Sequence, residues 1–441
     1  MDIIKIPEIL LPKKGTDYSK WSAIACDQFT SEKSYWDDVA EITRGAHSTY
    51  HITFPEVFLG GDEGERIRSI NAEMERYIRE DFFERITDSF ILTERTTKYT
   101  DVPRYGLVLS VDLDAYDFKP FNKAYIKATE GTILERLPVR IKIRENASLE
   151  LPHILLLIDD RKKSVIEPLK TDKKSLEILY DFDLMKEGGH IKGYRVTNAE
   201  EVIQTIYALL DRDTLTEKYG SAESNFLFAV GDGNHSLATA KACWETLKKS
   251  LSAEEQKNHP ARYALVELMN LYDDALKFEP IHRVIFNADS DFLEGLKKVG
   301  KDGIETGFEG VKKTENGGIE ADLNGLKKTV KSGAGKVTAF DKERSYTISV
   351  SSHSAEAIKE IQSYIDTYSK THPNFVADYI HGEAHLKEIV KTQGGLGILM
   401  PSIQKSELFP YVVRQGVLPK KAFSMGEAEE KRYYLEAKKI R

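Results

Sequence analysis

The sequence is poor in cysteine. Cys26 and Cys243 are its two cysteines in 441 residues, and they do not form a CxxC pair. Two isolated thiols cannot build the disulfide framework of a small secreted domain or the four-ligand site of a zinc ribbon. The composition therefore predicts a protein of a reducing, cytoplasmic compartment.

Long hydrophobic runs are also lacking. No apolar stretch approaches the roughly 20 residues that a helix needs to cross a bilayer. The first residues, MDIIKIPEILLPKKG, place an acid before the bases and contain two prolines and a short apolar run. A signal peptide has the opposite charge order and a longer apolar segment. We expect a soluble, unexported protein with no membrane partner.

The chain has no excess of positive charge. Its 63 Lys and Arg residues are outnumbered by 71 Asp and Glu residues, which gives a net charge of −8. General nucleic-acid binding needs clustered cations to neutralise phosphates, so it is not expected. The composition is otherwise that of a globular protein, with 41% hydrophobic residues. A chain of this length predicts two or three domains with a substantial core.

The most informative segment is FLFAVGDGNHSLATAK at residues 226–241. Its apolar run, 226–230, predicts a buried strand because turn residues bound it immediately. Gly231 and Gly233 permit a tight turn, and a helix is predicted from His235 onward. Unpaired N–H groups and the helix dipole attract anions to such a helix start. We therefore predict a phosphate- or nucleotide-binding loop that includes Gly231, Gly233, Asn234 and Ser236.

The same segment has a simpler interpretation. Strand, glycine turn and helix also form plain connections in α/β proteins, with Asn234 or Ser236 serving as an N-cap. The loop lacks the Gly-Lys-Ser/Thr ending of a P-loop and the three-glycine spacing of a dinucleotide fold. The residues of the segment alone leave both interpretations open.

Hydrophobic periodicity predicts a mixture of helices and strands. Helices are expected at 63–86, 174–180, 197–210, 235 onward, 355–368 and 408–415. Strands are expected at 90–92, 105–112, 124–128, 139–143, 154–158, 226–230 and 346–350. For residues 431–440, propensity favours a helix whereas 432–435 suit a strand, and both remain open.

One composition shift suggests a boundary. Residues 302–336 are rich in Gly and Lys and poor in large apolar side chains, as in a surface appendage or a domain boundary. We expect an α+β core at 1–300 that carries the GDGNHS loop. An appendage or boundary with strands follows at 301–352, and a C-terminal α+β segment at 353–441 packs on the core.

Several segments together resemble one family. They are WSAIACDQFTSEKSYW, ATEGTILERLPVRIKIRENASLELPHILLLIDD, GDGNHSLATAK, the pair His282-Arg283, DYIHG at 378–382, and FSMGEAEEKRYYLEAKKI. These segments span nearly the whole chain. On their resemblance, the protein is identified as a member of the bacterial and archaeal domain-of-unknown-function family 1015. The resemblance extends to the ParB/sulfiredoxin-like superfamily. It implies an α+β fold with a mixed sheet core, additional α/β elements and a C-terminal α+β region.

The resemblance also implies a function. Members of that superfamily bind nucleotides or phosphates at a helix start, and some are small-molecule kinases. The implied activity is phosphoryl transfer or nucleotide hydrolysis on a small molecule; the alternative is a non-catalytic, nucleotide-sensing binding protein. In many relatives the loop reads Asp-Gly-His-His-Arg, whereas Asn234 and Ser236 stand here for one His and the Arg. A hydroxyl does not replace the charge of a guanidinium, so a phosphate partner is missing.

Candidates for the missing cation come from two places. Arg140, Lys142 and Arg144 alternate on the predicted strand 139–143, which would put all three on one face of a sheet. Arg283, beside His282, could project from the start of another strand. An exposed sheet face and a surface ion pair are the alternatives.

Three acids are candidates for the chemistry. Glu130, in ATEGT at a strand end, is the leading general base, and Asp232 is the leading metal or hydroxyl partner. Phosphoryl transfer implies Mg²⁺ together with a nucleotide. His235 completes the catalytic candidates. Asp27, His282 and His381 are candidates for residues that line the site.

Other reactive residues are less favoured. A buried Cys26 behaves as a small hydrophobe, so we do not expect it to be a nucleophile. The pairs His47 and His51, and His381 and His385, have a spacing that can chelate a metal, but neither matches the HExxH template. The sequence leaves the oligomeric state open, a dimer included.

Overall fold

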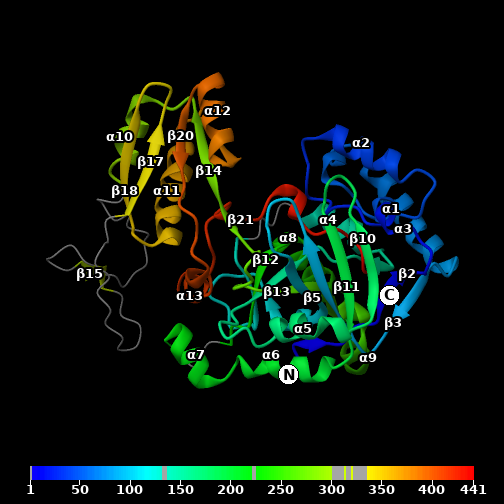
Figure 1. Cartoon of the computed structure of the whole chain (residues 1–441). Helices are drawn as coiled ribbons and strands as arrows, with labels where there is room; N and C mark the ends of the chain where they lie inside the picture. The colour runs from blue at the N-terminus through cyan, green and yellow to red at the C-terminus, as the bar shows by residue number, and fades with distance from the viewer. Residues whose placement is uncertain (1, 132–136, 221–224, 300–311, 314–318, 321–334) are drawn as a thin grey trace. The chain divides into compact units, whose positions relative to one another are not determined.

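The computed structural model describes residues 2–131, 137–220, 225–299, 312–313, 319–320 and 335–441 (Figure 1). The chain folds into two units. Unit 1 comprises Met1–Lys277, Val412–Val417 and Met425–Arg441, and unit 2 comprises Phe278–Tyr411 and Leu418–Ser424. The expected appendage at 301–352 falls largely outside the described residues, so the division at 1–300, 301–352 and 353–441 stays a prediction.

Ten strands of unit 1 form one mixed sheet. Along the sheet they are β10 (Ile178–Asp183), β11 (His190–Val196), β4 (Phe90–Thr96), β5 (Arg104–Asp112), β13 (Tyr263–Asn270), β9 (Leu155–Ile158), β12 (Phe228–Asp232), β7 (Ile126–Ala128) and β6 (Tyr116–Asp117), with β1 (Ile4–Lys5) on β5. The parallel pairs are β13 with β9, β12 with β7, and β7 with β6. The remaining pairs are antiparallel, so the expected mixed α+β architecture is confirmed.

Both faces of this sheet are buried. On β5, Leu107 and Leu109 pack with α6 (Ala199–Ala208) and α8 (Asn234–Leu247). Val108 points the other way and joins the cluster around Trp36 of α2 (Lys33–Ile42). Successive side chains of a strand point to opposite faces, so a strand covered on both sides is apolar throughout. This explains why the central strands read as continuous apolar runs.

The other helices of unit 1 are α1 (Tyr18–Trp21), α3 (Glu63–Arg79), α4 (Leu137–Arg144), α5 (Ile166–Asp172), α7 (Arg212–Tyr219) and α9 (Ala253–Asn258). Two strand pairs lie outside the large sheet. They are β2 (Ile9–Pro12) with β3 (Phe83–Ile86), and β8 (Leu149–Glu150) with β22 (Lys438–Lys439). The second pair fixes the end of the chain within unit 1.

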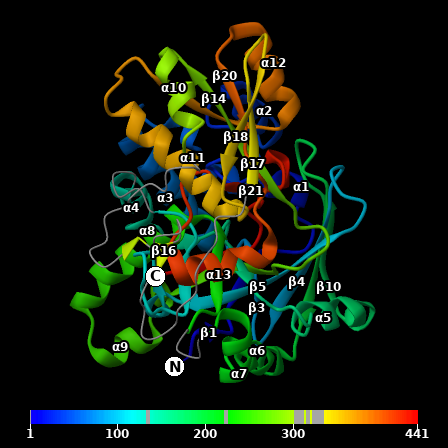
Figure 2. The ribbon, with the colours of Figure 1, turned by 90° about the vertical axis from the view of Figure 1, so that its left-hand side faces the viewer.

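Unit 2 has its own antiparallel sheet, in the order β18 (Ser345–Val350), β17 (Gly335–Phe340), β20 (Leu396–Leu399), β14 (Phe278–Phe286) and β19 (Val376–His381). Its helices include α10 (Ser290–Leu296), α11 (Ser354–Ser369) and α12 (Glu383–Gln393) (Figure 2). Val284 packs with α12, whereas its neighbour Arg283 bonds to Gln362 of α11. The two helices therefore cover opposite faces. The chain passes from one unit to the other within α13 (Lys405–Gln415) and again within β21 (Phe423–Met425). A separate short pair is formed by β15 (Lys312–Lys313) and β16 (Ile319–Glu320).

Several predicted elements are confirmed, among them the strand at 226–230 and the helices from 235, at 355–368 and at 408–415. Others differ from the structure in part or entirely. The helix predicted at 63–86 is present but ends at Arg79 and gives way to β3. Residues 139–143 lie in helix α4, and most of 174–180 is a short turn followed by β10. The tail at 431–440 is mostly irregular and contains only the short strand β22.

In the described ranges, no helix is both long and apolar enough to cross a membrane.

Candidate functional site

The turn between β12 and α8 is the centre of the candidate site. β12 ends at Asp232, Gly233 has a left-handed backbone with φ of +78°, and α8 begins at Asn234. The first helical bond runs from Leu237 N to the Gly233 carbonyl at 3.0 Å. A left-handed residue lets the chain leave the strand and enter the helix in one step. The predicted strand, turn and helix are therefore present at this position.

Both glycines of the turn are required by their surroundings. A Cβ on Gly231 would stand 2.8 Å from Met425 Sδ. A Cβ on Gly233 would stand 3.0 Å from the Ile154 Cα, and the positive φ adds strain for any other residue. The turn is thus packed tightly against two other segments of unit 1.

The start of α8 lacks a side-chain cap. No side chain accepts a hydrogen bond at its N-cap position, Gly233. The side-chain oxygen of Asn234, Oδ1, is buried and has no hydrogen-bond partner among the described residues. Uncapped N–H groups and a positive dipole end favour an anion at this position. The expectation that Asn234 or Ser236 caps the helix is not met, which removes one part of the simpler interpretation.

A cation stands beside the turn. Lys431 Nζ lies 3.2 Å from Asp232 Oδ2, with side-chain exposures of 12% and 26%. The other oxygen, Asp232 Oδ1, accepts a hydrogen bond from Gly233 N at 2.9 Å. Lys431 comes from the C-terminal tail, about 200 residues further along the chain. It places a positive charge beside the turn, and the sequence patterns did not single it out.

A second carboxylate belongs to the same cluster. Burial works to raise the pKa of Asp27, but His153, a hydrogen bond from Gln28 and the nearby Lys431 together lower it. Asp27 is therefore ionised at neutral pH. Burial and this carboxylate raise the pKa of the adjacent Cys26 thiol to about 12, and a hydrogen bond with Tyr434 acts in the opposite direction. The thiol stays protonated, which agrees with the expectation that Cys26 is not a nucleophile.

Three side chains form a hydrogen-bonded chain at the start of α8. Ser236 Oγ lies 2.7 Å from His153 Nε2, and His153 Nδ1 lies 3.0 Å from the Tyr434 hydroxyl. That hydroxyl also accepts a hydrogen bond from Cys26 N at 3.2 Å. The sequence patterns did not mark His153 or Tyr434, although both lie inside segments that carry the family resemblance.

The structure places Glu130 at the same edge of the sheet. β7 runs parallel to β12 with Ala128 opposite Val230, and Thr129 Oγ1 donates to the Val230 carbonyl at 2.6 Å. Glu130 comes two residues after Ala128, and Asp232 comes two residues after Val230. Both residues therefore lie where these neighbouring parallel strands end. Ligands of α/β proteins commonly bind at this end of the strands.

The predicted row of cations is wrong, because its residues lie on helix α4. In a helix, Arg140 and Arg144 share a face while Lys142 points elsewhere. Arg140 pairs with Glu56, and Arg144 pairs with the buried Glu150. Arg140 remains near the cluster, because Glu56 N donates to the Cys26 carbonyl at 2.8 Å.

Three other predicted residues belong to unit 2. Arg283 is fully buried and donates to Gln362 and to the Lys421 carbonyl, both within that unit. His282 Nδ1 accepts a hydrogen bond from Met400 N at 3.1 Å. His381 lies on β19 and His385 on α12, so they do not share one helix. These three residues therefore belong to unit 2, whereas the β12–α8 turn belongs to unit 1.

His47 and His51, the histidine pair of unit 1, each contact a different group. His47 Nε2 lies 2.9 Å from Glu80 Oε2, and His51 Nε2 lies 3.3 Å from the Thr43 carbonyl. Both line a cavity of about 890 Å³ that shares no lining residue with the turn. The cavity also contains Arg66 and Arg76. The structure gives no indication that His47 and His51 hold one metal.

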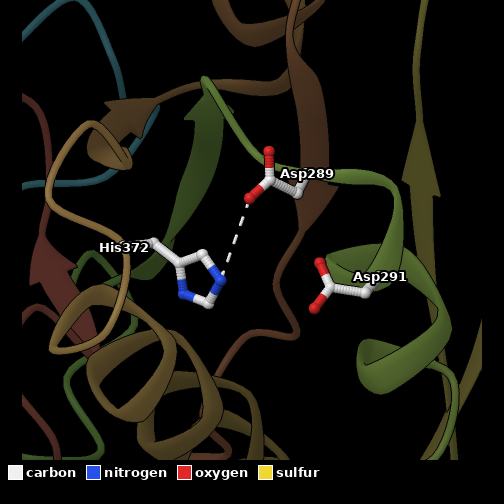
Figure 3. Close-up of side chains that lie close together, drawn as sticks. All are labelled: Asp289, Asp291 and His372. Carbon is white, nitrogen blue, oxygen red and sulfur yellow. Dashed lines mark ion pairs between the residues drawn. The ribbon is translucent and has the colours of Figure 1, made fainter.

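A possible metal-binding arrangement lies in unit 2, where Asp289, Asp291 and His372 offer ligand atoms within 4.8 Å of one another (Figure 3). His372 Nε2 is 3.8 Å from Asp289 Oδ2, and the Tyr368 hydroxyl donates to Asp291 Oδ1 at 2.7 Å. Both carboxylates are exposed. Exposed acids cluster commonly without an ion, so we assign no function to this group.

Comparisons with known proteins give a family and no curated relative. A family model described as "Protein of unknown function (DUF1015)" matches residues 10–368. No curated protein matches the chain. The solved structures found include a free serine kinase in complex with AMP, which is 11% identical with a TM-score of 0.37, over 76% of this chain and 92% of its own.

Two other solved structures are similarly distant. A conserved hypothetical protein from Pyrococcus furiosus is 12% identical with a TM-score of 0.34, over 74% of this chain and 90% of its own. A C-terminally truncated SbnI from Staphylococcus aureus is 9% identical with a TM-score of 0.34, over 72% of this chain and 82% of its own. Likenesses at these TM-scores carry no argument about fold or ligand.

Proposed function

This chain belongs to the DUF1015 family, whose description assigns no activity, and from the site alone we propose that it is a nucleotide-dependent phosphotransferase or nucleotide hydrolase. The first turn of α8 binds the phosphate groups, and the acceptor is a small molecule or water. In this proposal unit 1 contains a ParB/sulfiredoxin-like fold, and the protein works in the cytoplasm as a monomer or a dimer.

The uncapped start of α8 carries the proposal. Its first turn presents N–H groups at a tight glycine turn, and no side chain caps them among the described residues. A phosphate oxygen satisfies such N–H groups and is favoured by the helix dipole. Lys431 adds a full positive charge beside the turn. Backbone donors together with a cation are the usual means of phosphate binding.

The carboxylates of the site suit a Mg²⁺ ion. Asp232 pairs with Lys431, and the lowered pKa of Asp27, to which the charge of Lys431 contributes, keeps that second carboxyl group ionised. Mg²⁺ prefers one or two carboxylates together with phosphate oxygens. These two side chains would hold the ion, which would neutralise charge on the phosphates. Glu130, at the end of β7, is the proposed general base for the acceptor hydroxyl, and His235 stays a catalytic candidate.

One observation favours the non-catalytic alternative. Asp232 is engaged by both Lys431 and Gly233 N, so it is held as a structural carboxylate and not as a free base. If Glu130 has no catalytic role either, the loop would bind a nucleotide without efficient chemistry. A nucleotide-sensing protein would then be the function.

Calorimetry with ATP, ADP and AMP, each with and without Mg²⁺, tests the proposal. The wild-type protein is expected to bind at least one of them, and Lys431→Ala to bind it about 10- to 100-fold more weakly, because a charged hydrogen bond contributes about 1.5–3 kcal/mol. Lys431→Arg should retain most of the affinity. Lys98→Ala, which removes an exposed lysine paired with Glu187, is the control and should bind normally.

The same samples separate the two functions. Release of ADP, AMP or phosphate in a metabolite pool, lost in Glu130→Gln while binding persists, supports the enzyme. Binding that survives this substitution without any turnover supports the sensing protein. No binding of any nucleotide by the wild-type chain would rule out both.

A further inference from the structure

The chain of hydrogen bonds from Ser236 to Tyr434 contains the parts of an activated nucleophile. A serine hydroxyl contacts an imidazole nitrogen at 2.7 Å, and the other nitrogen of that ring is held by a third group at 3.0 Å. Nucleophilic serines are recognised by this arrangement, in which a base is oriented by a further partner. The three residues come from the start of α8, the segment before β9 and the C-terminal tail.

A base role defines the proton positions along this chain. In that role His153 donates Nδ1–H to the Tyr434 hydroxyl oxygen, which also accepts a hydrogen bond from Cys26 N. An imidazole that carries its one proton on Nδ1 presents a lone pair on Nε2, and the Ser236 hydroxyl donates to that lone pair.

The surroundings suit a serine that loses its proton. Ser236 stands in the first turn of α8, where the helix dipole favours negative charge. Lys431 adds a positive charge beside the same turn through its ion pair with Asp232. Tyr434 is 2% exposed and its pKa is raised well above the ordinary value by burial, so it remains a neutral phenol.

We propose that Ser236 is a nucleophile that carries the phosphoryl group between donor and acceptor, with His153 as its base and Tyr434 as a positioning residue. This inference rests on the proposed function and names its intermediate. Ser236 Oγ forms a bond to the terminal phosphorus of the nucleotide, and the bond from that phosphorus to its bridging oxygen breaks. The electron pair leaves with the shortened nucleotide, and the Oγ proton moves to His153 Nε2.

The second half of the cycle restores the serine. The hydroxyl of a small molecule, or water, attacks the phosphoserine and takes the phosphoryl group. Its proton passes to Glu130, the proposed general base, which releases it to solvent. The Ser236 oxygen leaves and regains its proton from His153. Atoms and charges balance over the two steps, and no oxidant or further co-reactant is needed. The proposal therefore predicts ping-pong exchange, in which the nucleotide product leaves before the acceptor reacts.

Two probes test the serine itself. The full-length protein is incubated with ATP and Mg²⁺ without an acceptor, quenched, and mapped by peptide mass spectrometry. A parallel sample receives a fluorophosphonate, which reports serine nucleophilicity without a nucleotide, because fluoride leaves as the Oγ–phosphorus bond forms. We expect both probes to modify Ser236, and Ser250→Ala, at an exposed serine of the same unit, to behave as the wild type does.

Variants distinguish a base from a structural partner. His153→Gln should slow modification of Ser236 by about 10²- to 10⁴-fold, the usual contribution of a general base. Tyr434→Phe keeps the ring but removes the acceptor for Nδ1–H, so it should slow modification and change its dependence on pH. A purely structural tyrosine would alter stability without moving that pH profile. Ser236→Ala should lose modification by both probes and should lose turnover.

Failure of this inference can be told apart from failure of the proposed function. If ATP binds and is turned over, but Ser236 is modified by neither probe and Ser236→Ala turns over at the wild-type rate, the nucleophile is rejected and the binding site stands. Modification of Ser236 that is unaffected by His153→Gln also overturns the proposed base. If no nucleotide binds and the fluorophosphonate leaves Ser236 unmodified, both proposals fall.

Discussion

Two consecutive residues of the C-terminal tail carry positive charge in different surroundings. Lys431 is partly accessible and pairs with Asp232 at the candidate site. Arg432 is 3% exposed; its Nε lies 3.2 Å from Glu267 Oε2, and its guanidinium also pairs with Glu436. A buried charge is tolerated only when it is paired. The tail therefore contributes the cation of the proposed phosphate site and, beside it, a buried cation that pairs within the core.

Substitution of Arg432 by Met should destabilise the protein strongly. The change leaves Glu267 and Glu436 buried without their cation, and removing one partner of a buried pair costs about 3–5 kcal/mol. The free energy of unfolding, measured by urea denaturation, should fall by this amount. Lys98→Met is the control, because the Lys98–Glu187 pair is exposed and solvent screens its attraction, so its loss should change stability little. Equal losses for the two variants would contradict this account.

Glu150 should make stability depend on pH in the acid range. Burial works to raise the pKa of Glu150, but Lys438, Arg144 and a hydrogen bond from Leu265 N lower it below its ordinary value. A carboxylate with a depressed pKa in the folded state contributes stability that is fully present above its unfolded value, about 4.3. That stability is lost as the pH falls through the folded value.

The pH profile of unfolding checks this directly. Between about pH 6 and pH 3 the free energy of unfolding of the wild type should fall, because the unfolded chain binds protons more readily there. Glu150→Gln should be less stable at pH 7 and show a shallower fall. Glu75→Gln, at an exposed position on α3, should keep the wild-type slope. An unchanged slope in Glu150→Gln would show that this carboxylate does not contribute.

The sequence predicted the turn but not the residues that converge on it. Gly231, Asp232 and Gly233 form a contiguous signal, so their strand-turn-helix arrangement could be predicted. His153 and Tyr434 are separated by 281 residues, and only the fold brings them together. Lys431 lies in a charged tail where nothing local distinguishes it from its neighbours. Arg283 shows the converse error. Its local sequence suggested a site residue, but its guanidinium donates to Gln362 and to the Lys421 carbonyl within unit 2.

At the scale of elements, α4 shows where local patterns mislead. The segment VRIKIR alternates β-branched and charged residues, as a strand would. Pro138 suits the first turn of a helix, and the folded segment packs against α8. Tertiary packing therefore decided the structure. The opposite error occurred at 174–180, where pairing of β10 with β11 outweighed helical propensity.

The junction of β12 and α8 should tolerate no side chain at residue 233. Gly233→Ala combines a left-handed residue, which costs about 1–2 kcal/mol, with a close approach to the Ile154 backbone that leaves no room. Gly220 is a matched control, because it is also left-handed, at the end of α7, but has nothing near its Cβ position. Thermal unfolding should show a larger loss for Gly233→Ala, and only this variant should lose nucleotide binding. Equal losses with normal binding would contradict a tight turn at the site.

At the scale of the molecule, each unit has a sheet and a core of its own. The central strands of unit 1 could be predicted because burial on both faces makes them continuously apolar. The point at which the chain divides could not, because packing between distant segments defines each unit and the chain crosses from one to the other more than once. The predicted site residues accordingly fall into two groups, and the proposed chemistry belongs to unit 1 alone.

Hydrogen exchange followed by mass spectrometry, on the full-length chain with and without ATP and Mg²⁺, tests the central claim most directly. The nucleotide should slow exchange of the backbone amides at residues 228–240, because the phosphates occupy the first turn of α8. Exchange in α11 and α12 of unit 2 should stay unchanged, and Lys431→Ala should weaken the protection. Protection confined to unit 2, or none at saturating nucleotide, would contradict a phosphate site at the start of α8.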